Sequence, residues 1–235
     1  MMLNIQQLQV NRGGKAVLHG VDLHIRPGAI TALLGANGAG KSSTVLALGG
    51  LLPIQGGQIT LDGAALRCGR PEWVRAQGVS IVPEGHQVLG DLTVRDNLQA
   101  AATALPAREV AGAMEKMLAI FPELRAKLDA PGRSLSGGQK QMVCLAQALI
   151  TSPKYLVVDE LSLGLAPAIV VRLTQVLNDI AAQGVGVLLI EQFTSLALSV
   201  AQDAFVMSRG RIAFSGAAAA LAQDPDILHK AYLGA

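Results

Sequence analysis

A run of eight residues near the amino terminus has the composition of a phosphate-binding loop. Residues 35–42 read Gly-Ala-Asn-Gly-Ala-Gly-Lys-Ser and match the pattern G-x-x-x-x-G-K-[ST]. Glycines let such a backbone curl so that its N–H groups point at phosphate oxygens, and the following helix start attracts the same anion. Lys41 is expected to pair with the β- and γ-phosphates of a nucleotide, and the Ser42 hydroxyl to ligate Mg²⁺. The residues expected to contact the phosphates are Gly35, Asn37, Gly38, Ala39, Gly40, Lys41, Ser42 and Ser43.

A pair of carboxylates follows a second apolar run. Asp159 and Glu160 come directly after residues 155–158, which read as a buried strand. Because the carboxyl ends of parallel strands meet at one ligand-binding edge, both acids are expected beside the phosphate loop. There Asp159 can hold Mg²⁺ through water, and Glu160 can polarise an attacking water. An acidic pair after a strand is often only a turn, but downstream of a phosphate loop hydrolysis is the better interpretation.

The apolar pattern predicts an α/β fold that positions these residues. The predicted strands of its main sheet are 30–34, 79–82, 155–158, 185–190 and 205–207. The predicted helices are 41–52, which Pro53 ends, 168–182 and 195–201. Alternating strands and helices favour a mainly parallel sheet with helices on both faces. Shorter runs at 8–10, 21–25 and 58–61 predict an antiparallel β part at the amino terminus.

A helical insert interrupts this alternation. Residues 93–127 carry apolar side chains at helical spacing, and Pro106 and Pro122 divide the segment into pieces. We predict one domain over residues 1–235, in which a helical subdomain occupies about 85–150 and the remainder forms the nucleotide-binding core. The alanine-rich stretch at 217–221 is expected to begin a terminal helix.

The composition excludes several classes of protein. The chain has 235 residues, of which 51% are hydrophobic, so it can bury a sizeable core and is not disordered. No stretch approaches the roughly 18–20 apolar residues of a membrane span. Lys and Arg number 19 against 17 Asp and Glu, without a basic cluster, which argues against a nucleic-acid partner. Cys68 and Cys144 lie too far apart in sequence for a metal or redox motif.

A second anion-binding pattern is the most specific signal in the chain. Residues 135–139 read Leu-Ser-Gly-Gly-Gln, in which Ser136 is a good helix N-cap and the glycines leave the first N–H groups uncovered. This L-S-G-G-Q segment lies 20 residues before Asp159 (159 − 139). The sequence thereby resembles the nucleotide-binding subunits of ABC transporters, and the resemblance covers nearly the whole chain.

The resemblance implies a fold, a ligand and partners. It implies the ABC ATPase fold, with ATP and Mg²⁺ bound between two ATPase subunits, identical or homologous, that pack head to tail. The signature residues Ser136, Gly137, Gly138 and Gln139 would then contact the γ-phosphate in trans, and residues 162–165 would cross the dimer interface. The helical insert would dock on transmembrane permease subunits, which a periplasmic binding protein serves. Such a subunit acts at the cytoplasmic face of the bacterial inner membrane.

Three expected site positions depart from the usual family pattern. Arg12 stands where an aromatic side chain usually stacks on adenine, and a guanidinium can also stack on a purine. Glu84 replaces the Q-loop glutamine, and its carboxylate can ligate Mg²⁺ through water. Gln192 replaces the switch histidine, and its amide can hydrogen-bond a γ-phosphate.

The departures together resemble one branch of the family. Pro83-Glu84-Gly85, Glu191-Gln192, residues 162–167 and the terminal residues 231–235 are similar to the LivF-type ATPases of branched-chain amino-acid importers. Within that branch, Leu161 stands in place of a proline, and Gln147 and His86 each stand in place of an arginine. The effect of these three changes on turnover is left open.

Three alternatives are weighed against an importer ATPase for branched-chain amino acids. A urea-type importer ATPase is expected to keep the Q-loop glutamine, so Glu84 favours amino acids. A soluble ABC ATPase acting on ribosomes or DNA usually has two nucleotide units or a long coiled-coil insertion, for which 235 residues leave no room. A poorly hydrolysing regulatory subunit would explain Arg12, Glu84 and Gln192. Against it, Lys41, Asp159 and Glu160 are retained. The transported substrate is not readable from the sequence.

Overall fold

A computed structural model describes residues 2–223, 227–228 and 230. The strands are β1 (Leu3–Arg12), β2 (Lys15–Ile25), β3 (Ile30–Leu34), β4 (Ile54–Leu61), β5 (Ala64–Ala65), β6 (Val79–Val82), β7 (Tyr155–Asp159), β8 (Gly186–Glu191), β9 (Asp203–Ser208) and β10 (Arg211–Ala217). The α-helices are α1 (Lys41–Leu48), α2 (Pro71–Ala76), α3 (Val94–Ala101), α4 (Ala107–Ile120), α5 (Gly137–Leu149), α6 (Pro167–Ala182), α7 (Thr194–Val200) and α8 (Ala218–Gln223). Short 3-10 helices occupy Ala102–Ala104, Pro122–Lys127 and Gly132–Ser134. The terminal residues 231–235, which entered the branch resemblance, lie outside the described residues.

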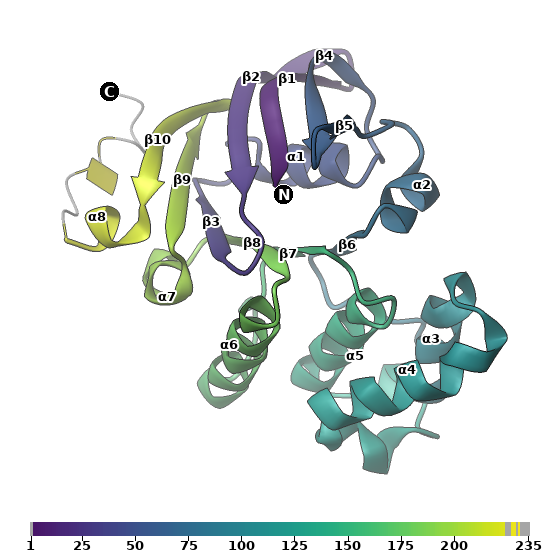
Figure 1. The fold of residues 1–235 in the computed structure, drawn as a ribbon. Helices are drawn as coiled ribbons and strands as arrows, with labels where there is room; N and C mark the ends of the chain where they lie inside the picture. Colours follow the sequence, from purple (N-terminus) through teal and green to yellow (C-terminus); the bar gives the residue numbers. More distant parts are fainter. Residues whose placement is uncertain (1, 224–226, 229, 231–235) are drawn as a thin grey trace.

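The strands form two sheets. One is antiparallel in the order β2-β1-β4-β5, and the other has the order β10-β9-β3-β8-β7-β6. Within the second sheet β9, β3, β8, β7 and β6 are mutually parallel, and only the edge strand β10 is antiparallel. The expected α/β class, with a mainly parallel sheet and an antiparallel part at the amino terminus, is confirmed (Figure 1).

Alternate side chains of the central strands pack into two different hydrophobic cores. In β7, Val157 faces the core that also contains α1 and the antiparallel sheet, whereas Leu156 and Val158 face the core that contains α5 and α6. Because successive side chains of a strand point to opposite faces, a strand buried on both sides reads as a continuous apolar run. This burial explains why residues 155–158 carried such a clear strand signal.

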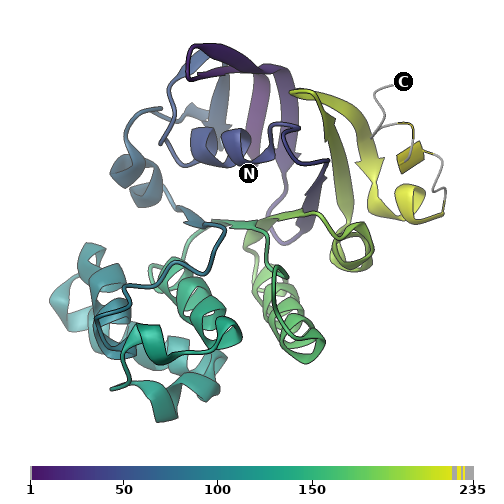
Figure 2. The ribbon, with the colours of Figure 1, turned by 180° about the vertical axis from the view of Figure 1, so that it is seen from behind.

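The helical insert forms a separate group beside the sheets. Helices α3, α4 and α5 lie together on one side of the molecule, and the connections to β6 and β7 join them to the rest (Figures 1 and 2). All three lie within the segment of about 85–150 that we expect to form a helical subdomain. Their apolar faces share a core that includes Leu98, Met117 and Leu145, together with Phe121 just after α4.

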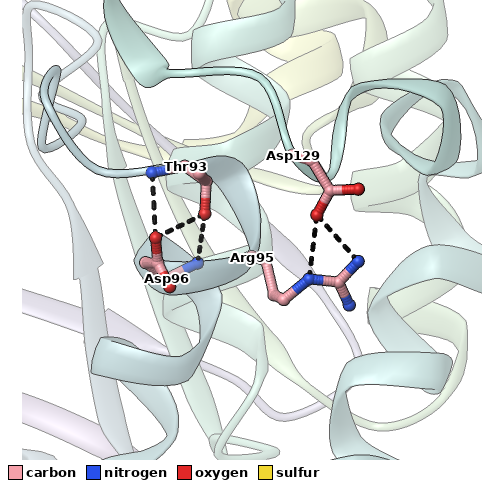
Figure 3. Close-up of polar contacts among 4 residues, drawn as sticks. All are labelled: Thr93, Arg95, Asp96 and Asp129. Atoms are coloured by element: carbon pink, nitrogen blue, oxygen red, sulfur yellow. Dashed lines mark hydrogen bonds and ion pairs between the residues drawn. The ribbon is translucent and has the colours of Figure 1, made fainter.

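Polar contacts fix the start of α3 within this group. Thr93 caps the helix, since its Oγ1 accepts from the Asp96 N–H at 3.1 Å and Asp96 Oδ2 accepts from the Thr93 N–H at 3.2 Å (Figure 3). The Thr93 hydroxyl also donates to Asp96 Oδ2, and this bond, followed by the one from the Thr93 N–H, lowers the pKa of Asp96. Arg95 donates from Nε and Nη2 to Asp129 Oδ1 at 3.1 and 3.0 Å, which ties the helix to the segment before α5 (Figure 3).

One expected helix boundary is wrong. The helix predicted over 41–52 ends at Leu48, four residues before the predicted end. Gly50 follows with a φ of +70°, a conformation that terminates helices, so the chain turns before Pro53 is reached. A Cβ on Gly49 would lie 2.4 Å from Cδ1 of Ile81, so the glycine also lets the turn pack closely on β6.

No helix among residues 2–223 is long and apolar enough to cross a membrane.

Alanine substitution at two glycines should separate backbone strain from steric clash. Gly57 and Gly63 both have positive φ, +76° and +83°, so either Cβ costs about 1 kcal/mol of backbone strain. A Cβ on Gly57 would also lie 2.3 Å from the carbonyl oxygens of Gln6 and Gln7, whereas one on Gly63 meets open space. We expect Gly57→Ala to lower the free energy of unfolding by about 2 kcal/mol more than Gly63→Ala in urea unfolding. Equal unfolding midpoints would contradict this packing of β1 on β4.

Candidate active site

The parallel register brings the expected site residues to one edge of the sheet. Leu34 at the end of β3 is level with Glu191 at the end of β8, and Asp159 at the end of β7 is level with Ile190. The phosphate loop, Glu160 and Gln192 therefore leave the sheet side by side. Glu84 follows the end of β6, which is the next strand in the same sheet.

The phosphate loop is packed from behind and open in front. A Cβ on Gly40 would lie 2.8 Å from Leu18 Cδ2, and one on Gly35 would lie 2.4 Å from the Met207 carbonyl oxygen. The Gly210 N–H donates to the Ala39 carbonyl oxygen at 2.7 Å, which anchors the loop to the turn between β9 and β10. Gly38, at a φ of +79°, has open space where its Cβ would be. The loop is thus a rigid cradle with one exposed side.

Lys41 lies inside this cradle. Its Nζ donates to the carbonyl oxygens of Gly35 at 2.7 Å and Ala36 at 3.1 Å, and the residue is only 6% exposed. Burial lowers the pKa of Lys41, while Glu160, Asp159 and Glu84 act in the opposite direction. The ammonium therefore lies among carboxylates at the position expected for a group that binds phosphate. At the start of the same helix Ser42 is exposed, and Ser43 is buried.

The carboxylates carry more negative charge than the single lysine balances. Burial, followed by Glu160 and Glu84, raises the pKa of Asp159 from 3.8 to about 6, and Lys41 opposes the shift. Asp159 and Glu160 are buried, whereas Glu84 is exposed. Such an acidic cluster fits a divalent cation, and oxygen ligands are those that Mg²⁺ prefers.

The protein alone does not provide a complete metal cage. Across the described residues no three His, Cys, Asp or Glu side chains converge on a common metal position. Mg²⁺ usually keeps waters and binds through one or two carboxylates plus substrate phosphates. The donor set of Ser42, Asp159 and Glu84 fits a Mg²⁺ ion that arrives with a nucleotide.

Gln192 and Glu160 meet directly. The Gln192 Nε2 donates to Glu160 Oε1 at 2.6 Å, across 32 residues of sequence. Glu160 has a φ of +55°, an uncommon conformation for a side chain without glycine's freedom, and its N–H donates to the Ile190 carbonyl oxygen at 2.9 Å. The structure therefore places the expected catalytic carboxylate and the expected switch residue in contact.

Glu191 is a site neighbour to which the sequence reasoning gave no role, since it entered only as part of the branch pattern. Its Oε1 accepts from the Ser162 N–H at 3.0 Å, and its Oε2 accepts from the Ser162 hydroxyl at 2.8 Å. Burial raises the pKa of Glu191, and both hydrogen bonds from Ser162 oppose that rise. The sequence did contain a signal for such a role, because Glu191 ends a fully apolar strand, and a carboxylate buried there requires hydrogen-bond partners.

The signature segment lies at the start of α5. Ser136 Oγ accepts from the Gln139 N–H at 3.3 Å, and Gln139 Oε1 accepts from the Ser136 N–H at 3.0 Å, so the expected N-cap is confirmed. Gly137 is exposed, whereas a Cβ on Gly138 would lie 2.9 Å from Ile169 on α6. Among the described residues no hydrogen bond or ion pair joins this segment to Lys41 or Asp159.

Arg12 ends β1 at the exposed tip of the hairpin with β2. The same β2 packs Leu18 against the phosphate loop at Gly40, which places the hairpin beside that loop. The position of Arg12 beside adenine stays a prediction.

Two residues that depart from the branch pattern have structural contacts. Leu161 is fully buried in the core that contains α5 and α6. Gln147, on α5, donates from Nε2 to the Asn97 carbonyl oxygen on α3 at 3.1 Å. Leu161 therefore stabilises the core, and Gln147 ties α5 to α3.

Comparison with known proteins agrees with this site. Residues 18–162 match the protein family described as ABC transporter. The chain is 34% identical to the high-affinity branched-chain amino acid transport ATP-binding protein BraG of Pseudomonas aeruginosa, over 99% of this chain and 100% of the relative. It is 33% identical to a probable branched-chain amino acid transport ATP-binding protein LivF of Archaeoglobus fulgidus, over 91% of this chain and 92% of the relative. The expected resemblance to such subunits is confirmed.

The relatives also include an exporter subunit and solved structures. The chain is 29% identical to the lipopolysaccharide export system ATP-binding protein LptB of Acidithiobacillus ferridurans, over 99% of this chain and 97% of the relative. A solved structure of an ATP binding subunit of an ABC transporter has a TM-score of 0.86 to this chain at 27% identity, covering 100% of this chain and 99% of that chain. Relatives with similar sequence identity to this chain are therefore named for different transported substrates.

Replacing Asp159 with Asn should stabilise the chain free of nucleotide and Mg²⁺ near neutral pH. The pKa of Asp159 is raised, so the ionised carboxylate costs the folded state free energy above about pH 6. That cost disappears as the pH falls towards 3.8, where folded and unfolded chains both hold the proton. We expect a gain on the order of 1–2 kcal/mol in the free energy of unfolding above about pH 6. Urea unfolding in a chelator should show the gain shrinking on acidification, and a gain independent of pH would contradict the raised pKa.

Proposed function

The chain belongs to the ABC transporter family and is an ATP-hydrolysing subunit of a transporter, and we propose that it powers an importer of branched-chain amino acids. The observation that carries the hydrolytic part is the contact of Gln192 with Glu160 at 2.6 Å, beside the phosphate loop. The amino-acid part is supported by the names of the BraG and LivF relatives and by the Glu84 and Glu191-Gln192 pattern.

Nucleotide binding is assigned to the cradle and to Lys41. The backbone N–H groups of residues 35–43 bind the phosphate oxygens, and the Lys41 ammonium moves from its two carbonyl contacts to the β- and γ-phosphates. Arg12 lies at the adenine side. Ser42, Asp159 and Glu84 hold Mg²⁺, which when bound supplies positive charge to the phosphate oxygens.

Hydrolysis is assigned to Glu160 and Gln192. The Glu160 carboxylate accepts the proton of the attacking water, and the Gln192 amide orients that carboxylate through the bond to Oε1. The second carboxylate oxygen, Oε2, is then available for the water. Gln192 can also donate to the γ-phosphate while that bond is kept, since its amide carries two N–H groups.

A second ATPase subunit, identical or homologous, completes the site. Ser136, Gly137, Gly138 and Gln139 of that subunit contact the γ-phosphate across a head-to-tail interface. Exposed apolar side chains close to the site, Leu163 at 41% and Phe193 at 59%, support an interface there. Each chain then supplies one phosphate loop and one signature segment.

The helical group faces the membrane partner. A groove of about 400 Å³ runs between β6 and α2 on one side and α3 and α5 on the other, and Arg75, Ser80, Gln87 and Gln147 line it. Leu51 lines the same groove and is 56% exposed. Transmembrane permease subunits dock here, at the cytoplasmic face of the bacterial inner membrane, and a periplasmic binding protein supplies the substrate to them.

Steady-state ATP hydrolysis with three proteins tests the catalytic assignment. Glu160→Gln should still bind ATP and trap a dimer but lose turnover by at least about a hundredfold, because the base for water is removed. Lys41→Ala should instead lose ATP binding. Wild-type turnover in Glu160→Gln would show that another group is the base. If the wild-type chain itself binds ATP but does not hydrolyse it, the alternative of a poorly hydrolysing regulatory subunit is favoured.

Reconstitution with its own permease tests the substrate. The tagged chain is purified from membranes of its source organism, and the permease that copurifies is placed in liposomes with its binding protein. We expect leucine, isoleucine or valine to stimulate ATP hydrolysis and to be taken up. Stimulation by urea, or copurification with lipopolysaccharide export components, would overturn the amino-acid assignment and leave the ATPase assignment intact.

A further inference from the structure

The segment that follows Glu160 is held from two directions. On one side, Glu191 at the end of β8 accepts the N–H and the hydroxyl of Ser162 at 3.0 and 2.8 Å. On the other side, the Leu163 carbonyl oxygen lies 3.1 Å from Nε2 of His86, in the loop after β6. Neither Ser162 nor Leu163 is the expected base, but together these contacts fix the direction of the chain just after Glu160.

His86 also contacts the signature helix. Its Nδ1 lies 2.7 Å from Oε1 of Gln141, which is on α5 and is 1% exposed. The imidazole edge is close to the signature itself, since a Cβ on Gly137 would lie 3.9 Å from the His86 ring. One half-buried side chain therefore joins the loop after β6, the helix that carries the signature and the segment after the carboxylate.

The hydrogen-bond requirements of this bridge are specific. The Leu163 carbonyl oxygen can only accept, so Nε2 of His86 must carry a proton. A neutral ring then needs a donor at Nδ1, which the Gln141 amide supplies if it is rotated to present its Nε2. In the present orientation that Nε2 is buried without a hydrogen-bond partner, so the rotation gives it one. A protonated ring makes both contacts as they stand, so the bridge forms in either state.

The backbone of Glu160 needs such support. Its φ of +55° is costly for a residue other than glycine and persists only where the surroundings enforce it. The bonds to Ser162 and Leu163 restrain the two positions immediately beyond Leu161, which is itself fully buried. Loss of one restraint lets the segment relax and turns the Glu160 carboxylate away from the attacking water.

We propose that His86 is a positioning residue for ATP hydrolysis, which ties the segment bearing Glu160 to the signature helix through Leu163 and Gln141. The proposal rests on the proposed role of Glu160. The hydrogen bonds of His86 to described residues go to Gln141 and Leu163, and none goes to Lys41 or the phosphate loop, so His86 acts on the carboxylate only through the backbone. Its consequence is that placement of Glu160 depends on the position of α5, whose first turn would contact the nucleotide of the other subunit.

Steady-state kinetics of His86 variants test the proposal, in the chain alone and in its transporter complex. We expect His86→Ala to lower kcat by about tenfold or more and to change KM for ATP by less than about threefold, because only the geometry of Glu160 is affected. His86→Arg should restore most of kcat, since a guanidinium supplies N–H donors to the same two oxygens. Thermal unfolding midpoints of all variants show whether each remains folded.

A double-mutant cycle with Gln141 distinguishes positioning from general packing. Gln141→Leu should lower kcat in the wild-type background and have little further effect in His86→Ala, because both changes break the same bridge. Additive effects, or a His86→Arg that is as slow as His86→Ala, would overturn the proposal. An unchanged kcat in His86→Ala would overturn it as well.

Glu160→Gln, assayed in parallel, separates the two assignments. If Glu160→Gln is inactive and His86→Ala is fully active, the positioning role of His86 is overturned and the proposed function stands. If turnover survives in Glu160→Gln, the proposed function and the positioning role are overturned together. The same holds if the wild type does not hydrolyse ATP, either alone or in its transporter complex.

Discussion

Parallel pairing of β3, β8 and β7 is the constraint on which the rest of the molecule depends. The pairing of Leu34 with Glu191 and of Asp159 with Ile190 sets the phosphate loop, the carboxylates and Gln192 at one level. A slip of one residue would turn every side chain of a strand to the other face and remove these contacts together. The two cores resist such a slip, because each central strand is packed on both of its faces.

Electrostatic balance is a second constraint, and the free protein meets it only in part. Burial lowers the pKa of Lys41, whose ammonium is directed at backbone carbonyls, and burial together with the neighbouring acids raises the pKa of Asp159 to about 6. Both shifts show that charged groups have been removed from water without full compensation. A polyphosphate with a divalent cation would supply a negative partner for Lys41 and a positive partner for the acids. The rigid back of the loop means that little rearrangement would accompany binding.

The phosphate loop, the strand-end acids and the N-cap at Ser136 could be predicted from sequence because each depends on residues close together in the chain. A glycine pattern, an apolar run or a capping serine is visible within about ten residues. The α/β class followed from the same local patterns. Helix α2 and strand β10 were not anticipated: α2 is short, and β10 is an edge strand without fully buried side chains.

The contacts that complete the site could not be predicted from the sequence, because they join residues that are far apart in the chain. Gln192 meets Glu160 across 32 residues, Glu191 meets Ser162 across 29, and His86 meets Leu163 across 77. Each depends on the order of strands in the sheet, which no local pattern encodes. The early end of α1 is different, because Gly49 and Gly50 directly after Leu48 were a local signal for it, and Gly50 adopts the φ of +70° that ends the helix.

The cap at Ser136 determines the polarity that this residue presents to its surroundings. Its oxygen already accepts the Gln139 N–H, so a lone pair is committed inside the helix start while the hydroxyl proton remains to be directed outward. The side chain can therefore donate to a partner while it keeps its bond to the helix. The adjacent exposed Gly137 has no side chain that could obstruct an approaching group. An incoming oxyanion finds that hydroxyl and the free N–H groups at the positive end of the helix dipole, whereas a cation is repelled by the same dipole, so the helix start discriminates by charge sign without carrying a charged residue.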